Sequence, residues 1–309
     1  MMKYTFLLPA YKSAFLKQAL QSILCQTFCD FKVLVSDDCS PEPIKEVVDG
    51  FANDSRVCYR RNESNFGAIR LVDHWNMLLS LCDSEYVIVA SDDDVYEPRF
   101  LEEVEKLTTK YPNVDLFHAR ANTIDAKGVV GYSDSVVEPF CDLNTFLLHF
   151  LNSNSVLCIG NYVFKTSMLK RLGGFVNFPN AWKSDTATQI ALAVNGVVNT
   201  EDILFNFRMS GINISWQHKG DNMRDRQKLD ALFGFYKWFV DFCDEHKLLI
   251  SNDVIDEFKY KLEAEVRGYY WTLNVKEVWY VYQYMKKTHW FQSLRNHISF
   301  WWYWVKVSR

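Results

Sequence analysis

The chain has 309 residues, a formal net charge of −4 and 23% charged residues. This length allows one long α/β domain or one domain with an appendage, and the negative balance argues against a nucleic-acid-binding surface. Eight cysteines are scattered along the chain with no C-x-x-C pair and no Cys/His spacing typical of a zinc site. No secretion signal and no membrane-spanning run is expected, so the sequence favours a cytoplasmic protein.

Apolar runs and amphipathic stretches alternate over about the first 110 residues. We predict strands at 4–8, 31–35, 57–60 and 86–90, and helices at 13–24, 43–51, 68–81 and from 98 onward. Such an alternation predicts a doubly wound, mainly parallel sheet that binds ligands beyond the carboxyl ends of its strands. The pattern of residues 114–207 is mixed, with a strand at 114–118, a hairpin turn at 125–128 and a helix at 184–194 that Ser184 would cap. From about residue 221 the chain is expected to be helical.

Three segments with polar side chains follow predicted strands directly. They are Pro9-Ala10-Tyr11, Ser36-Asp37-Asp38 and Ser91-Asp92-Asp93-Asp94. Adjacent carboxylates at the end of a buried strand repel one another, and their desolvation is unfavourable unless a cation or a donor-rich ligand compensates. Magnesium is commonly held by one or two carboxylates plus substrate phosphates, so this pattern predicts a metal-diphosphate site. The alternative is a solvated loop whose last acids cap the next helix.

These three segments, followed by Gly173-Gly174-Phe175 and Asp185, resemble a family-two glycosyltransferase of the GT-A fold in order and spacing. The resemblance covers about residues 1–215. It implies a nucleotide-sugar-binding and catalytic domain over 1–220 and a helical C-terminal region over 221–309. The implied enzyme is an inverting hexosyl- or N-acetylhexosaminyltransferase that uses manganese or magnesium and a UDP-sugar, with a dTDP-sugar as the second choice.

The same resemblance implies roles for individual residues on the donor side. Pro9, Ala10 and Tyr11 would line the pocket for base and ribose, and Asp38 would accept a hydrogen bond from the imide N–H of uracil or thymine. Arg70 would reach the base or the diphosphate. Asp92 would hold the ribose or assist the metal, and Asp93 would ligate the metal. Three of these residues have a structural alternative: a core aromatic for Tyr11, a turn former for Asp38 and a solvated helix position for Arg70.

On the acceptor side, the resemblance implies that Asp185 is the general base, which takes the proton of the attacking hydroxyl. The alternative is an acid that the helix dipole stabilises in a first turn, and Glu201 and Asp202 are rival bases. Trp182 would stack on an acceptor sugar or belong to the core. Arg208 and His218 would lie on a mobile loop that closes on the diphosphate, or they would be surface charges.

The last stretch, 278–309, contains no Asp or Glu but is rich in basic and aromatic residues. A basic, tryptophan-rich helix suits the membrane interface, so we predict peripheral attachment to the inner leaflet. Such attachment fits an acceptor carried on a polyprenyl diphosphate, or another glycan. The resemblance then implies a role in bacterial surface-polysaccharide synthesis. The alternatives are an appendage that packs on the catalytic domain and a homodimer contact. Processive synthases of the family that this sequence resembles usually carry a Gln-x-x-Arg-Trp motif and membrane spans. Neither is found in this sequence, so the resemblance favours a single-addition enzyme over a polymerase.

Other functional classes fit the sequence less well. A sugar-nucleotide pyrophosphorylase would need a glycine-rich basic loop after the first strand, where Pro9-Ala10-Tyr11-Lys12 stands. A dinucleotide-dependent dehydrogenase would need G-x-G-x-x-G at that place. An inactive nucleotide-sugar-binding protein or membrane adaptor is disfavoured because both Asp93 and Asp185 are present.

Overall fold

The computed structural model describes residues 2–152, 156, 158–211, 222–269, 279 and 283. The chain divides into two compact units, Met1–Ser215 and Trp216–Arg309, and each is described by itself. In the described part of the chain, no helix combines the length and the apolar character needed to cross a membrane.

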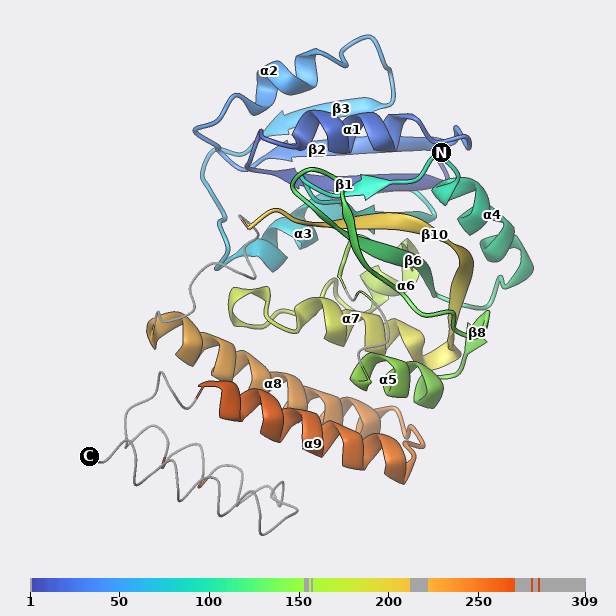
Figure 1. Cartoon of the computed structure of the whole chain (residues 1–309), viewed down its shortest axis with the longest axis vertical. Coiled ribbons are helices and arrows are strands. Elements are labelled where there is room, and N and C mark those ends of the chain that lie inside the picture. The colour runs from blue at the N-terminus through green and yellow to red at the C-terminus, as the bar shows by residue number, and fades with distance from the viewer. Residues whose placement is uncertain are drawn as a thin grey trace. The chain divides into compact units, whose positions relative to one another are not determined.

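The first unit is built on one sheet, in the order β3-β2-β1-β4-β9-β6-β10-β5 (Figure 1). Its N-terminal half is parallel and consists of β1 (Tyr4–Ala10), β2 (Phe31–Asp37), β3 (Val57–Arg61) and β4 (Tyr86–Val89). The other half is mixed and consists of β5 (Val95–Tyr96), β6 (Leu116–Asp125), β9 (Tyr162–Lys165) and β10 (Val197–Met209). Two short strands, β7 (Val130–Ser133) and β8 (Phe140–Cys141), pair with β6 and β10. The predicted α/β class is confirmed.

Helices cover both faces of this sheet, as expected for a doubly wound fold. Figure 1 shows α1 (Leu16–Leu24) and α2 (Ile44–Asp49) on one face and α3 (Leu71–Ser80), α6 (Thr166–Arg171) and α7 (Ser184–Leu192) on the other. The remaining helices of this unit are α4 (Phe100–Lys110), α5 (Leu143–Leu151) and the short 3₁₀ turns Pro179–Ala181 and Ala193–Asn195.

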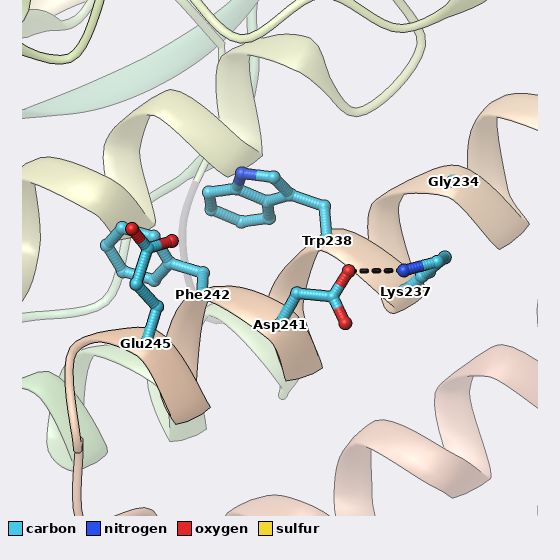
Figure 2. A pocket seen from close by; sticks show the side chains of 6 residues that line it. All are labelled: Gly234, Lys237, Trp238, Asp241, Phe242 and Glu245. Carbon is cyan, nitrogen blue, oxygen red and sulfur yellow. Dashed lines mark hydrogen bonds and ion pairs between the residues drawn. The ribbon is translucent and has the colours of Figure 1, made fainter.

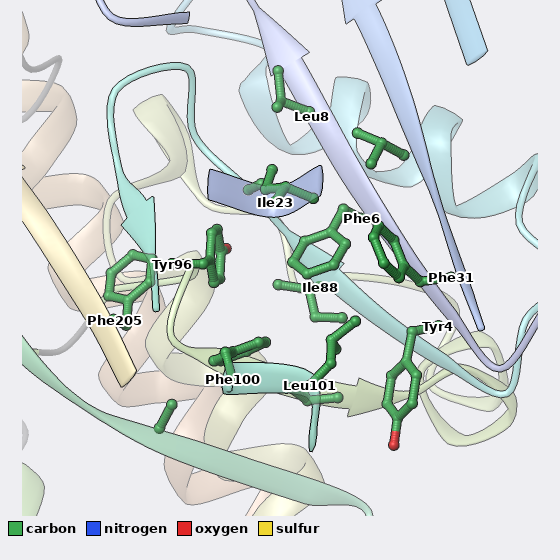
Figure 3. Packing of buried hydrophobic residues seen from close by; sticks show 14 of the residues in the cluster. Tyr4, Phe6, Leu8, Ile23, Phe31, Ile88, Tyr96, Phe100, Leu101 and Phe205 are labelled. Carbon is green, nitrogen blue, oxygen red and sulfur yellow. The ribbon is translucent and has the colours of Figure 1, made fainter. Parts of the chain in front are cut away.

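Alternation along the strands assigns side chains to the two faces. Tyr4, Phe6 and Leu8 of β1 are fully buried on the face that α1, α2 and α4 cover. There the rings of Phe6, Tyr96 and Phe100 meet edge to face, with the Phe6 and Phe100 centroids 5.1 and 4.9 Å from that of Tyr96 (Figure 3). Burying each such ring stabilises the fold by about 1.5–3 kcal/mol. This packing fixes the strands whose ends carry the polar segments.

The second unit contains α8 (Asn222–Glu245) and α9 (Asn252–Tyr269), which confirms the helical expectation for these ranges. The Phe239 and Phe258 rings stack 4.3 Å apart between the two helices. One side of α8 carries a pocket with the stacked rings of Trp238 and Phe242 and an ion pair between Lys237 and Asp241 (Figure 2). Except for Trp279 and Gln283, the stretch 278–309 lies outside the described residues.

Candidate functional site

The three predicted polar segments come together at one edge of the sheet, which we call the strand-end edge. Because β1, β2 and β4 are parallel, their carboxyl ends lie side by side. The Asp38 amide donates to the Ala10 carbonyl at 2.9 Å, and the Ala90 amide donates to the Leu7 carbonyl at 2.8 Å. The local sequence therefore places each segment at the end of its strand, and the register between the strands brings these ends together.

Asp92 links the loops that follow β1 and β4. Its Oδ2 accepts hydrogen bonds from the backbone amides of Tyr11 and Lys12, at 2.9 and 2.8 Å. Ser40, beyond β2, donates its hydroxyl to the Tyr11 carbonyl at 2.5 Å. The backbone of Tyr11 is thus held from both neighbouring loops, while its side chain is 42% exposed. A fixed backbone with an exposed ring is suited to stacking on a flat ligand.

Asp38 organises the loop that follows β3. Its carboxylate accepts from the amides of Phe66 and Gly67, at 2.9 and 3.0 Å, and from the Asn62 side chain at 3.0 Å. Asn62 also lies 3.2 Å from Nε2 of the buried His74. An ionised carboxylate has about four acceptor positions, so three internal bonds leave capacity for one ligand donor. Asn62 was missed by the sequence analysis, although it too directly follows a strand.

Arg70 reaches this same loop from the start of α3. Its guanidinium lies 4.7 Å from the centre of the Phe66 ring, and its Nε donates to Asp73 at 3.1 Å. The Phe66 ring in turn stacks on the His74 ring, with centroids 4.9 Å apart. The structure therefore brings Arg70 to the Asp38 side of the strand-end edge, as an exposed charge.

Arg208 lies elsewhere than expected. The resemblance implied a mobile loop, with a surface charge as the alternative, whereas Arg208 belongs to strand β10 and is 1% exposed. Its amide donates to Asp94 Oδ1 at 2.8 Å, and its Nε donates to the Asp93 carbonyl at 2.7 Å. Strand β5, which follows the acidic segment directly, pairs with β10 and brings the two together. Arg208 therefore positions the acidic loop. His218 lies outside the described residues.

The three acids of this loop have different surroundings. Asp92 and Asp94 accept backbone amides and fix the loop, and Asp93 lies between them as the candidate ligand of a cation. Burial, and then the charge of Asp92, raise the pKa of Asp93 to about 6. Burial and the charge of Asp93 raise the pKa of Asp94 to about 8. A divalent cation would relieve this repulsion, and a single carboxylate with a diphosphate matches the oxygen donors that magnesium or manganese prefers.

Replacing Asp94 by asparagine should change how stability depends on pH. The folded chain keeps the Asp94 proton up to about pH 8, whereas the unfolded chain releases it near the ordinary pKa of 3.8. Between these values the folded state binds more protons than the unfolded state, so the Asp94 contribution to the unfolding free energy falls as pH rises. Relative to the parent, Asp94→Asn should gain up to about 1.4 kcal/mol in unfolding free energy for each pH unit of that window. Urea unfolding of both proteins at low and high pH measures this, and a difference independent of pH would contradict it.

The loop between α6 and α7 carries the acceptor-side candidates. Asn76 of α3 accepts from the Phe175 amide at 2.7 Å and donates to its carbonyl at 3.2 Å. The first residue of α7, Ser184, accepts from the Phe178 amide at 2.9 Å. Ser184 is therefore not the N-cap that was expected, because Lys183, with a left-handed φ of 66°, occupies the capping position. The loop is held at both ends, and Asp185 lies in the first turn of α7.

Asp185 is partly buried, and burial raises the pKa of its carboxyl. Its Oδ1 accepts the amide of Thr186 at 2.8 Å. Burial raises the pKa of the Cys158 thiol, and the negative charges of Asp94 and Asp185 raise it further. The rival residues Glu201 and Asp202 are exposed, and Asp202 lies 3.4 Å from Arg99 in a surface ion pair.

The two hydrogen bonds between Asn76 and the Phe175 backbone require a glycine at position 174. A Cβ at this position would lie 2.3 Å from Asn76 Oδ1, and its φ is +105°. We expect Gly174→Ala to lower the unfolding free energy by about 3 kcal/mol, because steric overlap adds to the cost of a left-handed backbone. Gly173→Ala is the control, since its φ is +86° but a Cβ would meet nothing within 4 Å. Equal urea midpoints for the two variants would contradict this explanation.

Comparison with known proteins is consistent with this arrangement. The model of the family "Glycosyl transferase family 2" matches residues 5–171. The succinoglycan biosynthesis protein ExoW of Rhizobium meliloti is 32% identical over 131 residues, 41% of this chain and 40% of that protein. The poly(ribitol-phosphate) β-N-acetylglucosaminyltransferase TarS of Staphylococcus aureus is 25% identical over 188 residues, 60% of this chain and 31% of TarS. The chain thus matches less than half the length of either relative.

Two solved structures share the fold. TarS 1–349 in complex with UDP-GlcNAc superposes with a TM-score of 0.60 at 16% identity, over 89% of this chain and 85% of that one. The mannosyltransferase PcManGT of Pyrobaculum calidifontis, in complex with GDP-Man and Mn²⁺, superposes with a TM-score of 0.56 at 13% identity, over 99% and 86%. These likenesses confirm the predicted GT-A fold.

Proposed function

Because the chain belongs to glycosyl transferase family 2, we propose that it is an inverting, metal-dependent glycosyltransferase that uses a nucleotide diphosphate sugar. The observation that carries the proposal is the strand-end edge, where hydrogen bonds that Asp92 and Asp38 accept from backbone amides join the loops after β1, β2, β3 and β4. This edge offers an exposed aromatic ring, carboxylate acceptors and a buried acidic cluster in one place. The ring would stack on the base, the carboxylates would accept hydrogen bonds from the base and the ribose, and the acidic cluster would hold the cation that binds the diphosphate.

We place the donor along this edge. The Tyr11 ring would stack on the base beside Pro9 and Ala10, and Asp38 would accept the imide N–H that uracil and thymine have and cytosine lacks. Asp92 would accept a ribose hydroxyl, and Arg70 is a candidate for the diphosphate. UDP is preferred over dTDP, and the UDP-GlcNAc complex of TarS supports this choice by likeness alone. A hexose or an N-acetylhexosamine would be the transferred sugar.

A divalent metal fits the donor set at Asp93. The repulsion that raises the pKa of Asp93 and Asp94 is what a cation would relieve, and the manganese complex of PcManGT supports the comparison. Manganese or magnesium would be held by Asp93 and the diphosphate, and when bound it would stabilise the negative charge of the leaving group. Arg208 would keep the Asp93 backbone in place through its bond to the carbonyl.

We assign the general-base role to Asp185. In a single displacement, the acceptor hydroxyl oxygen forms a bond to the anomeric carbon while the bond from that carbon to the diphosphate oxygen breaks. The bonding electrons leave with the nucleoside diphosphate, and the hydroxyl proton passes to the Asp185 carboxylate. A carboxyl whose pKa burial raises accepts this proton more readily than an exposed one. Trp182, three residues earlier, is the candidate platform for the acceptor sugar.

The acceptor and the cellular setting are proposed from relatives and from sequence. ExoW, by its name, takes part in succinoglycan biosynthesis, and we propose that this chain likewise acts in bacterial surface-polysaccharide synthesis, on a glycan or a polyprenyl-diphosphate-linked acceptor. Residues 221–309 would attach it to the inner leaflet or to a second copy. Sedimentation with anionic liposomes tests attachment to the membrane. A folded protein that stays in the supernatant at low salt would exclude membrane attachment.

The direct test of the function is a screen of nucleotide sugars. The purified chain, with Mn²⁺, is incubated with UDP-, dTDP- and GDP-sugars, and release of the nucleoside diphosphate is measured. Slow metal-dependent release from a UDP- or dTDP-sugar is expected, and the same ligand should raise the melting temperature because it binds the folded state. Failure of every donor both to stabilise the chain and to be hydrolysed would reject the proposal.

A further inference from the structure

Three side chains with metal-binding donor atoms meet beside the N-terminal end of β10. They are Glu138, before β8, Cys141, at the end of β8, and His149, on α5. His149 Nε2 lies 3.0 Å and Cys141 Sγ lies 3.8 Å from Glu138 Oε2. Within the described ranges, no other set of three His, Cys, Asp or Glu side chains brings its donor atoms within 4.8 Å of one another.

This cluster is separate from the strand-end edge. Cys141 pairs with Val197, the first residue of β10, whereas Arg208, which holds the acidic loop, lies eleven residues further along the same strand. At about 3.3 Å per residue, eleven residues of extended strand span up to roughly 36 Å. The cluster therefore cannot share a ligand with Asp93.

Asn199 of β10 fixes the positions of these side chains. Its side-chain amide donates to the Glu138 carbonyl at 2.8 Å and to Cys141 Sγ at 3.4 Å, and its backbone amide donates to the Pro139 carbonyl at 2.9 Å. Its Oδ1 lies 3.0 Å from Nδ1 of the buried His118, which orients the amide. Partners of this kind orient metal ligands and reduce the cost of assembling a site.

We propose that Glu138, Cys141 and His149 form a binding site for a zinc ion. Zinc is bound by cysteine sulfur, histidine nitrogen and carboxylate oxygen at about 2.0–2.3 Å, which puts tetrahedral ligands roughly 3.4–3.6 Å apart. The two separations from Glu138 Oε2, 3.0 and 3.8 Å, bracket this value, and all three donor atoms lie within 4.8 Å of one another, so side-chain movements of about 1 Å or less would form the site. Cys141 is buried and Glu138 is 62% exposed, so the ion would enter from the solvent side.

The chemistry of the donors separates this site from the proposed donor-sugar metal. Magnesium and manganese prefer oxygen ligands, whereas a thiolate and an imidazole favour zinc. The three ligands come from the segment before β8, from β8 and from α5, so a bound ion would tie α5 to the β8–β10 ladder. Zinc would therefore stabilise the fold without taking part in sugar transfer. The sequence did not predict this zinc site, because seven residues separate Cys141 from His149 and the third ligand is a glutamate, whereas common zinc motifs space cysteine and histidine more closely.

Cobalt and zinc titrations of the full-length, metal-free chain test this proposal. Co²⁺ should produce the near-ultraviolet charge-transfer band of a thiolate ligand, zinc should abolish the band, and zinc should raise the melting temperature. Oxygen ligands at Asp93 would not give that band, so the signal is independent of the proposed function. Binding should approach about one ion per chain by this signal.

Matched variants assign the signal to the cluster. Cys141→Ser and His149→Gln should lose the band or weaken zinc binding at least tenfold, whereas Cys82→Ser should keep both, because Cys82 is as buried as Cys141 but lies outside the cluster. His149 is partly exposed, so its variant should fold even if Cys141→Ser does not. Absence of a thiolate band in the parent chain, or an unchanged band in a folded His149→Gln, would overturn the proposal.

Discussion

Replacing Asp185 by asparagine is expected to lower kcat for sugar transfer by about 10²–10⁴-fold, the usual contribution of a positioned general base. Asparagine keeps the size of the side chain and an oxygen that can accept the Thr186 amide, which bonds to Asp185 Oδ1 at 2.8 Å. It cannot take the proton of the acceptor hydroxyl. The expected signature is a loss in kcat with little change in the dissociation constant for the donor, because Asp185 is assigned to the acceptor side.

The rival acid Asp202 provides the matched control. Asp202→Asn makes the same chemical change at an exposed position whose partner is a surface arginine, and it should alter kcat less than about twofold. Steady-state rates with the best donor from the nucleotide-sugar screen, together with calorimetric donor binding, separate the two variants. An Asp185→Asn enzyme with parental kcat would exclude this residue as the base. Loss of activity in Asp202→Asn alone would move the role to that residue.

The second large effect is expected at Asp93. Asp93→Asn should abolish the part of nucleotide affinity that depends on manganese, a loss of tenfold or more in the dissociation constant for UDP, or at least about 1.4 kcal/mol. The reason is electrostatic, because the amide cannot balance the charge of the cation and the diphosphate. Binding of UDP in the absence of metal should change little, since Tyr11, Asp38 and Asp92 remain. Calorimetry with and without Mn²⁺ measures both quantities.

Asp94→Asn is the control for this experiment. Its carboxyl, with a pKa of about 8, is mostly protonated near neutral pH, so the amide changes the charge of the site little. The acceptor oxygen for the Arg208 amide is kept as well. Metal-dependent UDP binding should therefore survive in Asp94→Asn. If the two variants lose it equally, the acidic loop acts as a unit and Asp93 is not the specific ligand.

The strand-end edge could be predicted because its residues follow strong local signals. The runs 4–8, 31–35 and 86–90 are mostly apolar, interrupted only by Thr5 and Lys32, and the segments that form the edge begin where each run ends. Parallel pairing then follows from the helices between the strands, and it brings the ends together without further information. Asn62, at the end of β3, obeys the same rule and was missed because the strand before it is short and partly exposed.

The other half of the fold could not be predicted in this way. Strand β10 is long, but polar residues 199–202 interrupt its apolar pattern, and its pairing with β6 shifts register between Asn199 and Ile203. Helix α5 and all of strand β9 except Lys165 fall in the stretch 143–164, which has no Asp, Glu, Lys or Arg, and there periodicity hardly separates a strand from a helix. Contacts between segments distant in sequence were therefore invisible, including Arg208 with the acidic loop and Asn199 with Cys141.

A crystal structure of the chain with Mn²⁺ and UDP tests the central claim most directly. We expect manganese, located by its anomalous signal, between the Asp93 carboxylate and the diphosphate, with uracil against the Tyr11 ring and its imide N–H directed at Asp38. Nucleotide bound away from the ends of β1, β2 and β4, or at this edge with Asp93 turned away from both the ion and the phosphates, would contradict it.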